Sequence, residues 1–270
     1  MKTLIWSVAW GEYRYMLQSL VYSMNKVGIE HDILAYCDEP IHGCKNKELI
    51  KDITLDQTQY WKFEYIRRVA EMDYDLFVFI DSDHYFVRKP SLDFSAIIGQ
   101  DQWHSFLESP LNDISTKRLD WWNAKNPQMV ALWRAFGVTQ KTVYNTNGGF
   151  WICRKNFADH AKETVSNFRE FQKKAGYNFP EEVAIAVLSH MFSLDYTSRF
   201  HKNYMDIWAS EWTGSFKDKI PTGEPWKFVE YMTNLETVVD PAIVHAMRSK
   251  KALVEVGKII MSQNTTRMYV

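Results

Sequence analysis

Residues 76–83 read Leu76-Phe77-Val78-Phe79-Ile80-Asp81-Ser82-Asp83, an unbroken apolar run followed by two carboxylates. Five bulky apolar residues bounded by polar ones are typical of a strand buried on both faces, as in a parallel sheet. Apolar runs upstream predict strands over residues 4–10 and 32–37, and a weaker one over 49–55. These stretches form the expected core of the fold.

Helical spacing of apolar residues predicts helices between these strands, over residues 17–27, with Gly28 as the stop, and over 59–72. Strands that alternate with helices indicate an α/β fold with a mixed, mostly parallel central sheet. The sequence favours one domain over residues 1–270, with a nucleotide-type half over 1–100 and a mixed half over 101–270.

The second half has a less regular pattern. Apolar runs predict strands over residues 103–107 and 149–153, and a short strand over 240–245 that ends on a histidine. A helix is expected from Phe157 until Gly176, and another from Pro180 to about Met191.

Composition excludes several classes of protein. The 270 residues carry 32 Lys plus Arg and 33 Asp plus Glu, so a basic nucleic-acid-binding face is not expected. No run approaches the ~20 apolar residues of a membrane span. The apolar start of the chain meets Gly11 too early for a signal peptide, so we expect a cytoplasmic protein. In that compartment Cys37, Cys44 and Cys153 are expected to be free thiols.

The carboxylates Asp81 and Asp83 follow the strongest strand of the chain. Ligands of open α/β sheets bind outside this end of the strands, and residues i and i+2 of an extended chain project the same way. Such a pair suits Mg²⁺ or Mn²⁺ held together with substrate phosphates. The alternative is that the two Asp residues merely turn the chain.

Other candidate residues each have a functional and a structural interpretation. The segment 145–149 contains Asn147, Gly148 and Gly149, which fit either close backbone approach to a sugar or a hairpin turn. Glu181 and Glu182 act in catalysis or complement a helix dipole.

His245 is a metal ligand or a structural histidine. Lys62, Lys250 and Lys251 are phosphate contacts or solvated charges. The chain lacks G-x-x-x-x-G-K-[ST], G-x-G-x-x-G, G-x-S-x-G and H-E-x-x-H, so the sites that these motifs build are not expected.

Taken in order, these motifs resemble the GT-A glycosyltransferases, and most closely their retaining glycogenin-like and bacterial lipopolysaccharide galactosyltransferase-like group. The resemblance runs over residues 4–251 and implies a single GT-A domain, whose half over 1–100 binds the nucleotide and whose half over 101–270 binds donor sugar and acceptor. The chain departs from the family pattern near its C-terminus, at Arg248, Ala252 and Leu253.

The resemblance also assigns roles to residues of this chain. It implies metal ligation by Asp81, Asp83 and His245, and catalytic roles for Glu182 and Glu181. Contacts with the donor are implied for Ala9, Trp10, Tyr13, Lys62, Ser82, Asn147, Gly148, Gly149 and Lys251.

The implied activity is metal-dependent transfer of a hexose from a nucleoside-diphosphate sugar to a saccharide or other hydroxyl acceptor. UDP-glucose and UDP-galactose are the first donors to consider. The histidine favours Mn²⁺, with Mg²⁺ as the alternative. If configuration is retained, Glu182 stabilises a cation-like sugar; if it is inverted, Glu181 or Glu182 is the general base.

Three other functions stay open at this stage. They are a haloacid-dehalogenase-type phosphatase with Asp81 as nucleophile, a sugar-nucleotide pyrophosphorylase, and a carbohydrate-binding module without catalysis. The aromatic content of 15%, with 11 Trp, fits a sugar-stacking surface. That acceptor groove is expected to include Trp121, Trp122, Trp208, Trp212 and Trp226.

Overall fold

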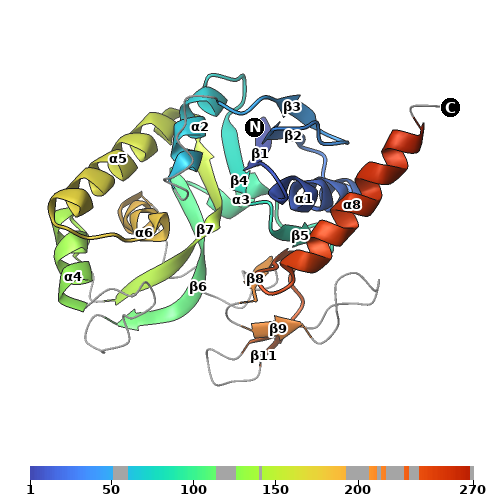
Figure 1. Cartoon of the computed structure of the whole chain (residues 1–270). Helices are drawn as coiled ribbons and strands as arrows, with labels where there is room; N and C mark the ends of the chain where they lie inside the picture. The colour runs from blue at the N-terminus through green and yellow to red at the C-terminus, as the bar shows by residue number, and fades with distance from the viewer. Residues whose placement is uncertain are drawn as a thin grey trace. The chain divides into compact units, whose positions relative to one another are not determined.

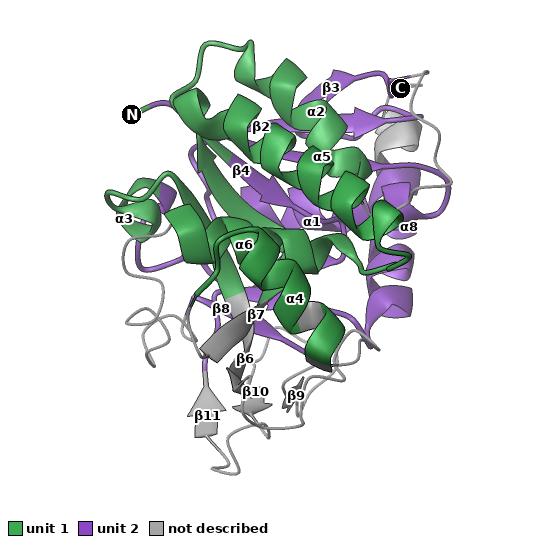
Figure 2. Ribbon diagram, turned by 90° about the vertical axis from the view of Figure 1, so that its left-hand side faces the viewer, with its two compact units in different colours: residues 1, 52–77, 95–200 green, residues 2–51, 78–94, 201–270 purple. Residues whose placement is uncertain are grey.

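The structure is a computed structural model, and it describes residues 1–50, 60–113, 126–139, 142–192, 207–211, 214–216, 228–230 and 237–267. The chain divides into two compact units, each assembled from separate segments (Figure 2). Unit 1 contains Met1 and residues 52–77 and 95–200, and unit 2 contains residues 2–51, 78–94 and 201–270. The expectation of one domain stays a prediction.

A mixed sheet of six strands, in the order β3-β2-β1-β4-β7-β6, confirms the α/β fold class (Figure 1). Its strands are β1 (Thr3–Ala9), β2 (Asp32–Cys37), β3 (Lys45–Lys47), β4 (Leu76–Ile80), β6 (Trp103–Asp113) and β7 (Thr142–Arg154). All five residues of β4 are buried, as its apolar run predicts.

In unit 2, β1, β2 and β3 are parallel, with Trp6 opposite Leu34 and Leu34 opposite Lys45. The expected strand over 49–55 is not found where the structure describes it, because residues 48–50 are irregular and 51–55 lie outside the described residues. Strand β3 precedes it, and its three side chains are exposed. A strand at the edge of the sheet with exposed side chains needs no apolar pattern, so hydrophobicity does not reveal it.

Helices α1 (Tyr13–Lys26) and α8 (Lys250–Arg267) lie side by side in unit 2 (Figure 1). Ser19 Oγ donates a hydrogen bond of 2.5 Å to the carbonyl of Leu253. Helix α1 begins earlier than its apolar spacing predicts, because its first three residues are exposed or half-buried. Its end at Lys26 is as expected, and Gly28 adopts the positive φ of 75° of a glycine that stops a helix.

Two small sheets complete unit 2. One has the order β5-β12-β8 and the other β11-β10-β9. Their strands are β5 (His84–Phe86), β8 (Trp208–Ser210), β9 (Gly214–Phe216), β10 (Phe228–Glu230), β11 (Thr237–Val239) and β12 (Ile243–His245). Strand β12 confirms the short strand expected to end on His245.

In unit 1, β6 and β7 pair in antiparallel fashion. The hairpin-turn interpretation of residues 145–149 is wrong, because these residues lie inside β7. The register shifts there: Ser105 pairs with Trp151, whereas Leu107 pairs with Thr146. The two glycines therefore serve an irregularity within a strand, which is a common place for glycine.

Five more α-helices lie in the described part of the chain. They are α2 (Trp61–Ala70), α3 (Phe94–Ile98), α4 (Asn126–Ala135), α5 (Ala158–Lys174) and α6 (Glu181–Phe192), and a 3₁₀ turn, η3 (Lys155–Phe157), precedes α5. Among the described residues, no helix combines the length and the apolarity that a membrane span requires. The three cysteines are free, as expected.

Candidate metal centre

Strand pairing in unit 2 gathers three potential metal ligands. In the antiparallel pair β5–β12, His84 lies directly opposite His245, and Asp83 immediately precedes β5. The two imidazole rings stack with centroids 4.6 Å apart and planes 9° apart. One ligand atom each from Asp83, His84 and His245 lies within 4.8 Å of the other two, and all three residues are buried. One carboxylate and two imidazoles can hold a divalent transition metal.

The carboxylate of Asp83 has basic side chains near both of its oxygens. Its Oδ1 lies 3.5 Å from His84 Nδ1 and 3.6 Å from His245 Nε2. Oδ1 is buried and accepts no hydrogen bond from a described residue, and Oδ2 lies 2.8 Å from Lys250 Nζ. Burial disfavours the ionised carboxyl, but His245 and then His84 outweigh it and hold the pKa of Asp83 well below its usual range.

The surroundings of His84 disfavour its protonated form. Burial is the main cause that lowers its pKa, and the neighbouring His245 lowers it further. A neutral imidazole is the form that binds metals. Lys250 shows the reverse effect: burial lowers its pKa, but the carboxylate of Asp83 overcomes this and raises it.

Ser210 supports the ring of His245 from the other side. Strand β8 runs parallel to β12 and places Ser210 opposite His245. A hydrogen bond of 3.1 Å joins Ser210 Oγ to His245 Nδ1, so the Nε2 atom is the one near Asp83. Metal-binding histidines are typically held through their second nitrogen in this way.

Glu211 fixes the chain between His245 and α8. It is buried, and its backbone N–H donates to the carbonyl of His245. Its carboxylate accepts the backbone N–H groups of Arg248 at 2.6 Å and Ser249 at 3.0 Å, and the hydroxyl of Ser249 at 2.7 Å. The start of α8, which carries Lys250, is thereby held by a charge-assisted cap.

The structure brings together two of the three predicted metal ligands, Asp83 and His245, and adds His84. Asp81 is not one of the three residues of this group. The backbone turns after Asp81, whose carbonyl accepts the N–H of His84, so residues 81–83 do not have the extended form that the sequence argument assumed. The charge of Asp81 still acts on both His84 and Lys250: it partly opposes the lowering of the His84 pKa and adds to the raised pKa of Lys250.

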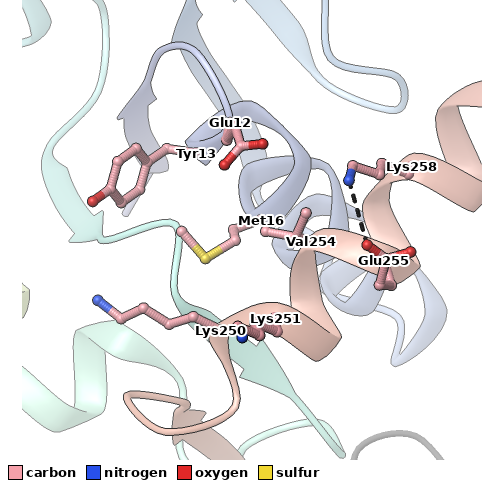
Figure 3. Close-up of a pocket in the computed structure, with 8 residues that line it drawn as sticks. All are labelled: Glu12, Tyr13, Met16, Lys250, Lys251, Val254, Glu255 and Lys258. Carbon is pink, nitrogen blue, oxygen red and sulfur yellow. Dashed lines mark hydrogen bonds and ion pairs between the residues drawn. The ribbon is translucent and has the colours of Figure 1, made fainter.

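A pocket of about 520 Å³ lies between the start of α1 and the first three turns of α8 in unit 2 (Figure 3). It is lined by Glu12, Tyr13, Met16, Lys250, Lys251, Val254, Glu255 and Lys258. Tyr13 and Lys251, both predicted donor contacts, therefore share one pocket. Of the other predicted contacts in this unit, Trp10 packs against Tyr13 with ring centroids 6.4 Å apart, and Ala9 and Ser82 are buried.

The remaining predicted residues form a second cluster, in unit 1. Lys62 is buried, and its ammonium donates to the carbonyl of Gly148 at 2.8 Å and to Glu181 Oε1 at 3.0 Å. It is therefore not a solvated charge. A Cβ on Gly148 would lie 2.9 Å from both Glu181 Oε1 and Glu182 Cγ, so a larger residue there would force both glutamate side chains to shift.

Polar groups beside Gly148 are also held in place. Asn147 Oδ1 accepts the N–H of Gly149 at 2.8 Å, and Thr146 Oγ1 donates to the carbonyl of Glu182 at 3.2 Å. Glu181 is buried whereas Glu182 is half-buried. Glu181 Oε2 accepts no hydrogen bond within the described part of the chain.

The proposed acceptor groove of Trp residues receives no support from the one member that the structure describes. Trp208 is only 4% exposed and stacks on His84 and His245, so the expectation that it lines a surface groove is wrong. The pairing of β8 with β12, which the sequence does not reveal, brings Trp208 against the two histidine rings. Trp121, Trp122, Trp212 and Trp226 lie outside the described residues.

Sequence reasoning missed His84, Ser210 and Glu211 as parts of the centre. His84 directly follows Asp83, but a single adjacent histidine carries little information. Comparison with protein-family models and with curated proteins finds no match to this chain. The residues and their geometry therefore carry the functional argument.

Proposed function

We propose that this protein is a metal-dependent glycosyltransferase that moves a hexose from a nucleoside-diphosphate sugar to a saccharide or other hydroxyl acceptor. The observation that carries the proposal is the buried group of Asp83, His84 and His245, whose ligand atoms lie within 4.8 Å. The residues fit a cation because Asp83 Oδ1 is buried and accepts no hydrogen bond from the described chain. Two imidazoles favour Mn²⁺ over Mg²⁺.

A cation at this centre supplies positive charge that stabilises the leaving diphosphate. The chain's own residues have complementary roles in the proposal. Lys251 offers a further positive charge in the pocket beside α1, and Tyr13 and Trp10 offer aromatic faces to the base of the nucleotide. UDP-glucose and UDP-galactose are the donors to test first, and Ser82 is assigned to the ribose.

The cluster of unit 1 is assigned to the donor sugar. Asn147, with the backbone at Gly148 and Gly149, orients the sugar hydroxyls. The buried ion pair with Lys62 engages Glu181, so Glu182, which is half-buried, is the carboxylate assigned to the anomeric carbon. In a retaining reaction it stabilises the cation-like sugar, and in an inverting reaction it acts as general base.

The test is hydrolysis and transfer of UDP-glucose and UDP-galactose by the purified protein with Mn²⁺ or with a chelator. Activity should require the metal and disappear in Asp83→Asn. Asp32→Asn is the matched control, because this exposed carboxylate belongs to the same unit and pairs with Lys45 on the surface. Full activity of Asp83→Asn in chelator would refute the proposal. The anomer of the product, assigned by NMR, separates retention from inversion.

The same preparation separates the other functions. Sugar binding that needs neither nucleotide nor metal would indicate a carbohydrate-binding module. Asp81-dependent release of phosphate from a phosphate monoester would indicate a phosphatase. Transfer of a nucleotide to a sugar phosphate would indicate a pyrophosphorylase. The cytoplasmic location expected from the sequence stays a prediction.

A further inference from the structure

Lys250 is the first residue of α8, and it makes an ion pair with the candidate metal centre. Its Nζ lies 2.8 Å from Oδ2 of Asp83, which also faces His84 and His245 through Oδ1. The Lys250 side chain is 37% exposed, whereas that of Asp83 is 11% exposed. The ammonium therefore reaches from a partly exposed helix start to a nearly buried carboxylate.

We propose that Lys250 competes with a divalent cation for Asp83 and thereby sets the metal affinity of the centre. The inference rests on the metal-binding part of the proposed function. It does not depend on which sugar or acceptor is used, nor on whether any transfer takes place.

The competition follows from charge and distance. An ammonium 2.8 Å from one carboxylate oxygen neutralises the same negative charge that a cation on Asp83 would use. A divalent cation that shares this carboxylate comes within a few ångströms of the ammonium, where like charges repel strongly. Lys250 must then move away, or the cation binds more weakly.

The pocket beside Lys250 gives its side chain room to move away from Asp83. Its stem lines the pocket between α1 and α8, where its polar end extends to the same side as that of Tyr13 (Figure 3). A lysine side chain is a flexible four-carbon stem with a strongly hydrated charge, so the ammonium can move into water, and the cost of its release is the loss of its ion pair with Asp83. The positive end of the helix dipole disfavours a cation in the first turn, so α8 does not hold Lys250 there.

Metal binding by the full chain tests the inference directly. Mn²⁺ alone is titrated calorimetrically into the wild type, Lys250→Met and Lys250→Gln. We expect about tenfold tighter binding in both variants, a change that corresponds to roughly 1.4 kcal/mol. An ordinary supporting residue would give the opposite result, since its loss weakens binding.

The matched control is Lys258→Met, which removes one charge from the same helix and the same pocket. Lys258 pairs with Glu255 at 3.3 Å, so the control should change the Mn²⁺ affinity by less than about twofold, as expected for a screened, distant charge. Circular dichroism of each variant confirms folding. Adding Asp83→Asn to Lys250→Met should abolish the gain.

The outcomes separate this inference from the proposed function. Equal or weaker Mn²⁺ binding by both Lys250 variants overturns the competition, even if the wild type transfers sugar. Tighter binding without any hydrolysis of sugar nucleotides supports the competition and counts against the transferase. If neither the wild type nor the variants bind Mn²⁺, both the metal centre and the competition are refuted.

Discussion

Gly257 lies where α8 packs tightly against the backbone of α1, and its replacement by alanine should destabilise unit 2. A Cβ at this position would lie 1.8 Å from the carbonyl oxygen of Tyr15, 2.5 Å from its carbonyl carbon and 2.8 Å from its Cα. These are backbone atoms of α1, so no rotamer change relieves the clash. Ordinary van der Waals contact begins at 3.4 Å, and the difference, 3.4 less 1.8, requires a separation of about 1.6 Å.

The magnitude follows from two opposing effects. Alanine is a better helix former than glycine by about 1 kcal/mol, which alone would stabilise α8. Overpacking of a tight contact costs about 1–3 kcal/mol and at times more, and separating the helices also weakens the hydrogen bond from Ser19 to Leu253. We therefore expect Gly257→Ala to lower the free energy of unfolding by about 1–2 kcal/mol, against the direction that propensity predicts.

The assay is urea unfolding followed by circular dichroism, with the midpoint compared between proteins. Gln263→Ala is the control, because Gln263 is exposed on the same helix and its replacement should stay within about 0.5 kcal/mol of the wild type. A Gly257→Ala protein as stable as the wild type, or more stable, would show that the backbones of α1 and α8 do not approach as described.

Three further predictions concern other buried groups. Ser210→Ala should weaken Mn²⁺ binding about 10–100-fold, because it frees the second nitrogen of His245; an unchanged affinity in calorimetry would contradict this role. Lys62→Met should cost about 3–5 kcal/mol in urea unfolding, because Glu181 then stays buried without its partner, whereas the double variant with Glu181→Gln should recover part of the loss. Equal stability of the Lys62 variant would refute the buried pair. Burial lowers the pKa of His190 to about 4, so the unfolded chain takes up a proton between about pH 6.5 and 4 that the folded protein does not. Stability should therefore fall through this window as pH decreases, by up to about 1.4 kcal/mol per pH unit, and level off below pH 4. A His190→Leu protein with the same pH dependence of its urea midpoint as the wild type would contradict this assignment.

The sequence predicted the strands and helices that are buried, because burial gives them a pattern of apolar residues. Strand β4 is completely buried, and β2 was expected with its observed ends. Strand β3 was missed because its exposed polar side chains carry no pattern. Residues 145–149 were open to a hairpin interpretation because the local sequence does not show whether two glycines turn a chain or distort a strand.

The candidate site was predictable only in part, for a similar reason. Asp83 and His245 stand at the ends of apolar runs, where ligand-binding residues are expected. His84 and Ser210 join them through the register of β5, β12 and β8, and pairing between strands far apart in the sequence cannot be read from local spacing. Because the chain turns after Asp81, the group contains the imidazole of His84 in place of the expected carboxylate of Asp81.

The interleaving of the two units has a consequence for the order of folding. Unit 2 begins near the start of the chain, is interrupted twice, and is completed by the last 70 residues, 201–270. Its contact between Ser19 and Leu253 spans 234 positions. Contacts of such long range form slowly. During synthesis, α1 cannot pack against α8 until nearly the whole chain has been made. The candidate metal centre is therefore completed late in folding, and an N-terminal fragment that carries Asp83 and His84 without β12 lacks His245, the third residue of the group.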